Sequence, residues 1–214
     1  VTLVETEPTL MEVLTIAVPD GFVIEGIAPI WADVDGVPGK EIIVTISDSE
    51  QGAQVVVFDE SGNRVASGPA IGRASRWRHQ IASGPFGPDG ETEVVDVLTP
   101  HIGGVVEFYR RQGEELRIVA QVSGYTSHVI GTRNLDMATA ADFDGDGRID
   151  LAVSQNGAAT RLFRNVGAVR GLRVRLAGPS LNPDAIGATI RMVYGTRRGP
   201  AREVQAGAGY WSHN

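Results

Sequence analysis

The feature that most constrains the fold is a repeated unit in which an acidic, glycine-containing loop leads into a short apolar run. Each unit continues through a glycine-marked turn into a second run, and the first two units continue into a third. The spacing from loop to loop is about 50 to 60 residues, close to the ~50 residues of a kelch-type propeller blade. The three loops, each with the run that follows it, are 32–36 with 41–44, 87–90 with 93–97, and 141–147 with 150–153.

Short apolar runs separated by glycine-rich turns favour β-strands over helices. The best helical candidate, 133–141, is short and leads straight into an acidic loop. A unit of three or four short antiparallel strands cannot cover both of its faces alone, but units stacked around an axis bury one another. The repeat therefore predicts an all-β fold, specifically a partial β-propeller.

The amino-terminal residues indicate that this propeller is incomplete. Residues 1–18 align with 105–122 as strand, polar turn and strand, so we expect 1–29 to be the outer half of a preceding blade and 30–166 to hold the following blades. That makes about three blades, whereas closed propellers have about four to eight. The chain also begins at Val1 without a Met or a leader, which favours a processed chain or an excised segment. We expect missing blades, another chain of a complex, or a second copy to cover the bare strand edges.

Composition narrows the functions open to such a fold. The formal net charge of −7 argues against a nucleic-acid partner, because phosphate binding needs clustered Lys and Arg, and small or apolar residues interrupt the densest basic stretches, 73–78 and 191–202. The absence of cysteine excludes disulfides, thiolate zinc sites and Fe–S clusters. No apolar run approaches the ~20 residues of a membrane-spanning helix. We expect no nucleic-acid partner and no membrane span.

The third acidic loop has the composition of a calcium site. It places carboxylates at positions one, three, five and nine, and it contains two glycines that allow the positive φ values needed to wrap around an ion. Calcium takes six to eight hard oxygen ligands, and carboxylates crowded this closely repel one another without a cation. The predicted ligands are the side chains of Asp142, Asp144, Asp146 and Asp150, with the backbone carbonyl of Arg148.

The residues of this loop also bear on three alternatives: an EF-hand, a metal-free turn and a magnesium site. An EF-hand needs a bidentate Glu at position twelve and flanking helices, but position twelve is Val153, inside a run that is typical of a strand. A metal-free Asp–Gly turn between two strands remains an alternative. Magnesium is disfavoured, because it retains its waters.

The first two acidic loops follow the pattern of the third but contain fewer acidic residues. In the first, Asp33, Asp35 and Glu41 occupy positions one, three and nine, while Val37 stands at position five, which predicts a weaker second metal site. In the second loop only two acids remain, and we expect no metal there. Calcium at 142–150 would pin a connection between strands, with an affinity on the order of 10⁻⁴ to 10⁻³ M that suits calcium-rich surroundings outside the cell.

Two stretches carry a family resemblance. The segment 141–153, followed by Leu162–Asn165, resembles the VCBS/FG-GAP repeat, which also builds the propeller of integrin α subunits. The tail resembles the opening of an ASPIC/UnbV domain, which follows a VCBS propeller in the cartilage acidic protein group. That resemblance implies a joint at 167–171 and the truncated start of a small β domain at 172–214. The residues that carry it are 172–176, 180–188, 202–204, 207–210 and Ser212.

The resemblance implies a setting more firmly than a reaction, since these proteins are mostly exported and many are interaction modules. No catalytic motif is present: there is no Gly-x-Ser-x-Gly elbow, His-Glu-x-x-His helix or phosphate-binding glycine loop. We therefore expect a secreted, periplasmic or cell-surface calcium-binding module, without catalysis, for a protein partner or surface polymer. The alternative is a glycan-acting lyase, dehydratase or hydrolase with its site at the propeller axis, where His79 and His128 could meet and where Trp31 and Trp77, otherwise wedges between blades, could stack on sugars.

Overall fold

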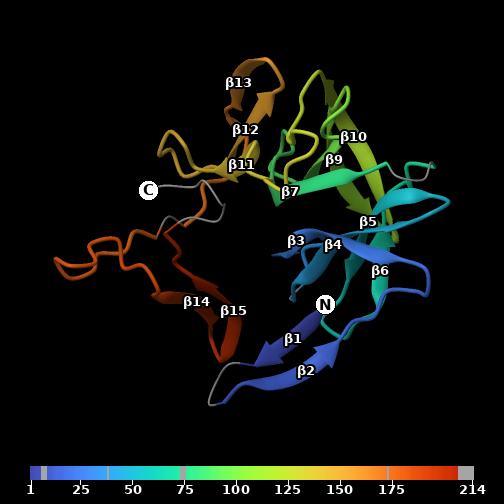
Figure 1. Ribbon diagram of the computed structural model, residues 1–214. Coiled ribbons are helices and arrows are strands. Elements are labelled where there is room, and N and C mark those ends of the chain that lie inside the picture. The colour runs from blue at the N-terminus through green and yellow to red at the C-terminus, as the bar shows by residue number, and fades with distance from the viewer. Residues whose placement is uncertain (6–8, 38, 73–75, 173, 207–214) are drawn as a thin grey trace. The chain divides into compact units, whose positions relative to one another are not determined.

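A computed structural model of the chain describes residues 1–214 except 6–8, 38, 73–75, 173 and 207–214. The chain divides into two units, Val1–Arg170 and Gly171–Asn214, and the division falls within the expected joint segment. Every regular element among the described residues is a β-strand, which confirms the prediction of an all-β fold (Figure 1). In the described part of the chain no helix has the length and apolarity that a membrane crossing requires.

The first unit begins with an antiparallel hairpin, which is followed by one large sheet and one small sheet. The hairpin pairs β1 (Thr2–Glu5) with β2 (Met11–Thr15). The strands of the large sheet are β3 (Val23–Ala32), β4 (Glu41–Asp48), β5 (Gly52–Phe58), β6 (Arg64–Ser67), β7 (Arg78–Pro85), β8 (Thr92–Leu98), β9 (Val105–Gln112) and β10 (Glu115–Ser123). The small sheet contains β11 (Ala138–Ala141), β12 (Asp150–Gln155) and β13 (Ala158–Phe163).

The eight-stranded sheet consists of two antiparallel halves. Its strand order is β3-β4-β5-β6-β10-β9-β8-β7, so each half follows the chain, and the halves meet where Ser67 of β6 pairs in parallel with Glu115 of β10. The two edge strands also approach each other, because the side-chain amide of Gln80 in β7 donates to the carbonyl of Ala28 in β3 at 2.9 Å. The sheet is thus nearly closed, in the manner of a barrel.

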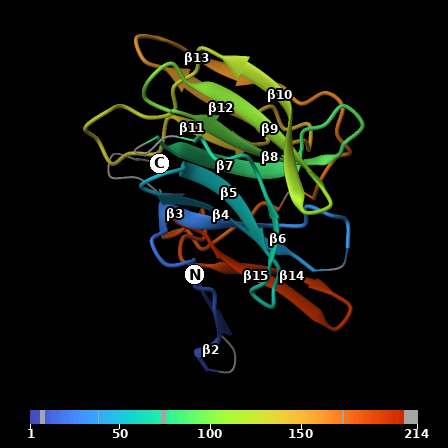
Figure 2. The ribbon, with the colours of Figure 1, turned by 90° about the vertical axis from the view of Figure 1, so that its right-hand side faces the viewer.

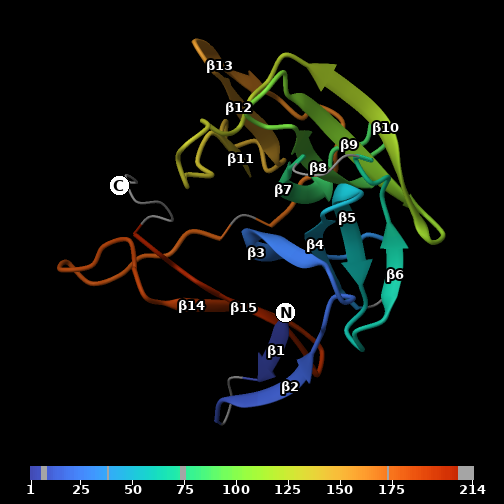
Figure 3. The same cartoon turned by 45° about the vertical axis from the view of Figure 1, so that its right-hand side comes forward.

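The central strands are buried on both faces, which explains why they read as continuous apolar runs in the sequence. Along β4, Ile43 points into a cluster that it shares with β8 and β9, while Ile42 and Val44 point into a cluster that is shared with the β1–β2 hairpin. A third cluster joins β8 and β9 to the small sheet through Val95, Leu151 and their neighbours. Each strand group therefore packs on the next one along the chain, as the three views show (Figures 1, 2 and 3).

A charged group lies buried between the two halves of the large sheet. Arg78 is 3% exposed and pairs with Asp96 at 3.1 Å and with Glu107 at 2.5 Å, and its guanidinium also contacts the hydroxyl of Tyr109. Burial raises the pKa of Asp96 to about 7, despite the opposing effect of Arg78. Arg78 belongs to one of the two basic stretches noted in the sequence, and the structure places it in the interior, where it neutralises buried carboxyl groups.

The second unit contains one antiparallel hairpin, β14 (Thr189–Tyr194) with β15 (Arg197–Glu203). Its register begins with Thr189 opposite Glu203. The carboxy-terminal part of the resemblance, 207–210 with Ser212, lies outside the described residues, as do Trp211 and His213.

Candidate metal centre

The loop 142–150 connects β11 to β12 and is held in shape by its own carboxylates. Asp142 accepts hydrogen bonds from the backbone N–H groups of Gly145 at 2.8 Å and Gly147 at 3.1 Å. Asp144 accepts from the N–H of Asp146 at 3.0 Å. Such side chain to backbone bonds are the usual way in which Asp folds a turn back on itself. The loop therefore curls with its acidic side chains gathered on its inner side.

Both glycines of this loop adopt backbone conformations that other residues rarely take. The φ angles are 81° at Gly145 and 87° at Gly147. At Gly147 a Cβ atom would also lie 3.3 Å from the side chain of Arg170. The prediction that these glycines allow the loop to wrap is consistent with this geometry.

The structure brings together three of the four predicted carboxylate ligands. One oxygen from each of Asp142, Asp144 and Asp146 can be chosen so that all three lie within 4.8 Å of one another, which is a spacing that a single cation can bridge. The arrangement fits a hard cation, because every donor is an oxygen and the loop is partly open to solvent.

Asp150, the fourth predicted ligand, is a buried anchor behind this group. The residue is 1% exposed. Its two carboxylate oxygens accept hydrogen bonds from the N–H groups of Phe143 at 3.1 Å and Asn165 at 2.9 Å. Each carboxylate oxygen has a second lone pair, so these bonds leave room for a metal contact. The geometry shows Asp150 tying the start of the loop to the segment after β13, and its role as a ligand stays a prediction.

Two arginines offset the charge of the acidic group. Arg148 contacts Asp146 at 2.8 Å, and Arg164 reaches Asp144 at 2.5 Å. Burial alone would raise the pKa of Asp146, but the N–H and guanidinium of Arg148, with Arg164, hold the pKa of that carboxyl below its ordinary value. The side chain of Arg148 also donates to the carbonyl of Ala168 at 2.6 Å. The predicted contact of its own carbonyl with a metal remains a prediction.

The loop 33–41, between β3 and β4, has the same construction. Asp33 accepts from the N–H of Gly36 at 2.7 Å, and the buried Glu41 accepts from the N–H of Val34 at 2.8 Å. One oxygen each from Asp33, Asp35 and Glu41 also lie within 4.8 Å of one another, so the predicted weaker site has its three carboxylates assembled. Burial raises the pKa of Glu41, against the opposing hydrogen bond from Val34.

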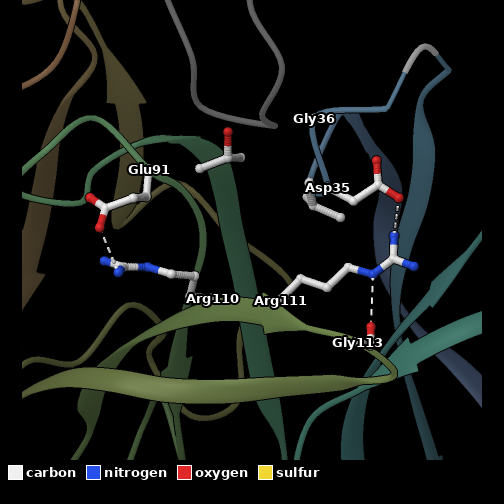
Figure 4. Close-up of a pocket in the computed structure, with 8 residues that line it drawn as sticks. Asp35, Gly36, Glu91, Arg110, Arg111 and Gly113 are labelled. Carbon is white, nitrogen blue, oxygen red and sulfur yellow. Dashed lines mark hydrogen bonds and ion pairs between the residues drawn. The ribbon is translucent and has the colours of Figure 1, made fainter.

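An arginine from the other half of the large sheet completes this second group. Arg111 of β9 contacts Asp35 at 2.6 Å and donates through Nε to the carbonyl of Gly113 at 3.0 Å (Figure 4). The two residues border an open cavity of about 440 Å³, across which Arg110 pairs with Glu91 at 2.6 Å (Figure 4). A guanidinium thus pairs with one of the three carboxylates of this group.

The loop 87–90 differs from the other two. Glu91 and Glu93 both pair with Arg110, at 2.6 Å each, and the Gly87 N–H donates to the carbonyl of Glu91. Among the described residues, the groups of three or more acidic or histidine side chains with such close ligand atoms are those of loops 33–41 and 142–150. Arginine, rather than a shared turn around an ion, holds the carboxylates of this loop.

The other residues singled out in the sequence fall into separate places. Trp31 packs against the cluster between the hairpin and the large sheet. Trp77 stacks on His79 with ring centroids 5.8 Å apart and meets the edge of His128 at 4.9 Å, so both histidines lie against this indole. His101 joins them, with its ring centroid 6.3 Å from that of Trp77, and no local sequence pattern predicts this.

Sequence reasoning also missed the partners of the carboxylates. The sequence pattern predicts Asn165 only as the end of a strand, yet its amide donates to the carbonyls of Pro85 and Ile149 at 2.8 and 3.2 Å, and its carbonyl accepts from the N–H of Ala168. Its position fifteen residues after Asp150, in the Leu-Phe-Arg-Asn run, was the available signal.

No protein-family model, no curated protein and no solved structure matches this chain.

Proposed function

We propose that this chain is a calcium-stabilised segment of a β-propeller of the VCBS/FG-GAP kind that acts as a binding or scaffold module outside the cytoplasm. The observation that carries the proposal is the assembly of the Asp142, Asp144 and Asp146 carboxylates within 4.8 Å in a loop whose backbone turns around them. A bound ion would pin the connection between β11 and β12. It would supply stability rather than a reaction.

Calcium is the cation that best suits these residues. The donors are carboxylates and a backbone carbonyl, which are hard oxygens, whereas zinc favours nitrogen and sulfur. Arg164, whose side chain is 59% exposed, can swing away from Asp144 when a cation binds, at little cost to packing. An affinity on the order of 10⁻⁴ to 10⁻³ M would fill the site outside the cell and leave it empty in cytosol.

The propeller part of the proposal is supported by the way in which the strand groups stack. Two four-stranded antiparallel groups, β3–β6 and β7–β10, are followed by β11–β13, and buried clusters join each group to the next. An acidic loop leads into the second strand of each group, at the same place in all three. Radial stacking of such groups leaves the loops and turns free to contact a protein partner or a surface polymer.

Thermal melting with and without calcium tests this function. For a dissociation constant of about 10⁻⁴ to 10⁻³ M, 10 mM Ca²⁺ should stabilise the chain by about 1.4–2.7 kcal/mol. This corresponds to a rise in Tm of roughly 3 to 10 °C. Mg²⁺ should give less, and Asp144→Ala should abolish the rise. Asp136→Ala, at an exposed aspartate six residues before the loop, is the matched control and should keep it. An unchanged Tm in the wild-type chain would refute the proposal.

One cavity favours a glycan-acting enzyme as a second candidate. A cavity of about 210 Å³ between β3, β7 and β11 is lined by Glu25, Trp77 and His79, among others. Burial raises the pKa of Glu25, and its Oε2 has no hydrogen-bond partner among the described residues, as would suit a general acid. If the cavity is catalytic, the chain should cleave a polyuronate or neutral glycan, and Glu25→Gln should slow cleavage by about 10²-fold or more. If neither polyuronates nor neutral glycans are cleaved, the enzyme candidate is refuted and the binding module remains as the function.

A further inference from the structure

Trp77 lies at the centre of three imidazole rings from separate parts of the chain. His79 belongs to β7, His101 to the turn between β8 and β9, and His128 to the connection between β10 and β11. The ring centroids of His101 and His128 are 5.7 Å apart, with their planes inclined by 69°. The fold therefore places two imidazoles edge to face, next to an indole, at a position far in sequence from the acidic loops.

The tautomer of His128 is fixed by its neighbour. Its Nε2 lies 3.1 Å from the carbonyl oxygen of Thr132, and a carbonyl can only accept, so Nε2 carries the proton. In the neutral ring, Nδ1 is then the lone-pair nitrogen. That atom is buried and has no hydrogen-bond partner in the described structure, and the same is true of Nδ1 of His101. Buried acceptors without a donor are costly and rare.

A metal ion would satisfy both nitrogens at once. A histidine that ligates a metal typically donates its other ring N–H to a carbonyl or carboxylate, which is the arrangement of His128 with Thr132. Zn–N bonds of about 2.0–2.1 Å in tetrahedral geometry place the centroids of two coordinated imidazoles about 5 to 6 Å apart. The observed separation of 5.7 Å falls within this range.

The electrostatic surroundings of His101 favour its neutral ring, which is the form of imidazole that binds metals. Burial lowers the pKa of His101, and His128 and Arg76 lower it further, with no carboxylate acting in the opposite direction. His79 is not gathered with this pair into a group of three ligands among the described residues, and its Nδ1 lies 2.7 Å from the hydroxyl of Ser127. The three-ligand groups among the described residues are confined to the acidic loops.

We propose that His101 and His128 bind a divalent transition metal, Zn²⁺, Ni²⁺ or Cu²⁺, through their Nδ1 atoms, with water completing the coordination. This site is independent of the calcium proposal, because its nitrogen donors suit borderline metals and the carboxylate loops suit hard ones. The metal would clamp the β8–β9 turn to the connection that leads into β11.

Trp77 is a reporter placed for the test. Its ring centroid lies 4.9 Å from that of His128 and 6.3 Å from that of His101, so a paramagnetic ion bound between them should quench its fluorescence. The chain is titrated with Ni²⁺ or Cu²⁺ in the presence of excess Ca²⁺, which occupies the acidic loops. The expected result is saturable quenching at one ion per chain, which Trp77→Phe removes.

The histidine variants decide between this pair and non-specific binding. Folding of each variant is checked by its far-UV spectrum, which should match that of the wild-type chain. His101→Ala and His128→Ala should then lose the quenching, whereas His213→Ala, which removes the fourth histidine of the chain, should retain it. Should the first two variants fail to fold, the shift of the imidazole ¹⁵N signals of the wild-type chain on adding Zn²⁺ decides. Quenching that does not saturate, persists without either histidine, or leaves both Nδ1 signals unmoved overturns the proposal.

Discussion

The loops 33–41 and 142–150 share one pattern of side chain to backbone hydrogen bonds and differ in the residues around it. Counting positions one to nine along each, position one accepts the N–H of position four, at 2.7 and 2.8 Å respectively. Position three accepts the N–H of position five, at 2.8 and 3.0 Å. Position nine accepts the N–H of position two, at 2.8 and 3.1 Å. The carboxylates at one, three and nine are therefore already needed to shape the turn, before any ion is considered.

The difference lies at position five and in the arginine nearby. Loop 142–150 has Asp146 there, where the other loop has Val37. Position three carries an arginine contact in both loops, at 2.5 and 2.6 Å, but the side chain of Arg164 is 59% exposed and that of Arg111 is 15% exposed. The comparison teaches that an acidic loop of this kind has a structural part and an ion-specific part. The second can be replaced by a guanidinium while the first is kept.

The largest expected effect comes from breaking the shared structural part. Asp150→Ala removes the acceptor of two N–H groups, those of Phe143 and Asn165, and should destabilise the chain by about 2–4 kcal/mol. Glu41→Ala removes the acceptor of one and should cost about 1–2 kcal/mol. Urea unfolding in EDTA measures both, since no ion contributes there. Equal losses, or none, would show that position nine does not anchor the two turns as described.

The next effect isolates the ion-specific part. Asp146→Val gives loop 142–150 the residue that loop 33–41 has at position five. The N–H of the valine can still donate to Asp144, whereas the N–H of Arg148 loses its acceptor, so the turn should be kept at a cost of about 1 kcal/mol in EDTA. The calcium-dependent stabilisation of about 1.4–2.7 kcal/mol should fall to nearly zero. Melting curves with Ca²⁺ and with EDTA measure this. A variant that is destabilised in EDTA, yet still responds to Ca²⁺, would show that position five is structural after all.

The division between the two parts also explains what the sequence could predict. The Asp-x-Asp-x-Asp spacing is local, so it located the carboxylates of Asp142, Asp144 and Asp146, and the apolar runs located the strands that follow each loop. Strands that precede the loops were not identified: β3 contains Gly26 and Pro29, with an irregular register between Glu25 and Ile30, and this breaks the alternation on which strand prediction rests. Strand β11 forms the last four residues of 133–141, the stretch with the best helical pattern in the sequence.

Contacts that depend on packing between strand groups were beyond local reasoning. The pairing of Arg111 with Asp35 and the meeting of His101 with His128 follow from how the groups stack, and no spacing in one sequence encodes this. The buried role of Asp150 was missed for a different reason. A carboxylate at position nine can bind an ion or anchor a turn, and the residue type is the same in both cases.

A gain of function sharpens the comparison from the other side. The double substitution Val37→Asp with Arg111→Gln gives loop 33–41 a fourth carboxylate, beside Asp33, Asp35 and Glu41, and removes the guanidinium that pairs with Asp35. It should add a second, weaker calcium equivalent, with stabilisation of about 1 kcal/mol at millimolar Ca²⁺. Isothermal titration measures the number of ions bound, and Val37→Asn is the control that adds an oxygen without the charge. If the folded double variant binds no more calcium ions than the wild-type chain, the shared hydrogen-bond pattern and the added carboxylate are not sufficient for a site.

The smallest effect concerns Arg111 alone. Its ion pair with Asp35 is 2.6 Å long and joins side chains that are 15% and 24% exposed, so solvent screens it only in part. Arg111→Gln should therefore destabilise the chain by about 0.5–1 kcal/mol, and by less at high salt, because the pair links the two halves of the sheet near its surface. Arg117→Gln is the matched control, since that ion pair with Glu115 joins side chains that are 60% and 63% exposed and should contribute almost nothing. If both variants lose the same stability, Arg111 is not a substitute cation, and the first loop would have to be held by its backbone hydrogen bonds alone.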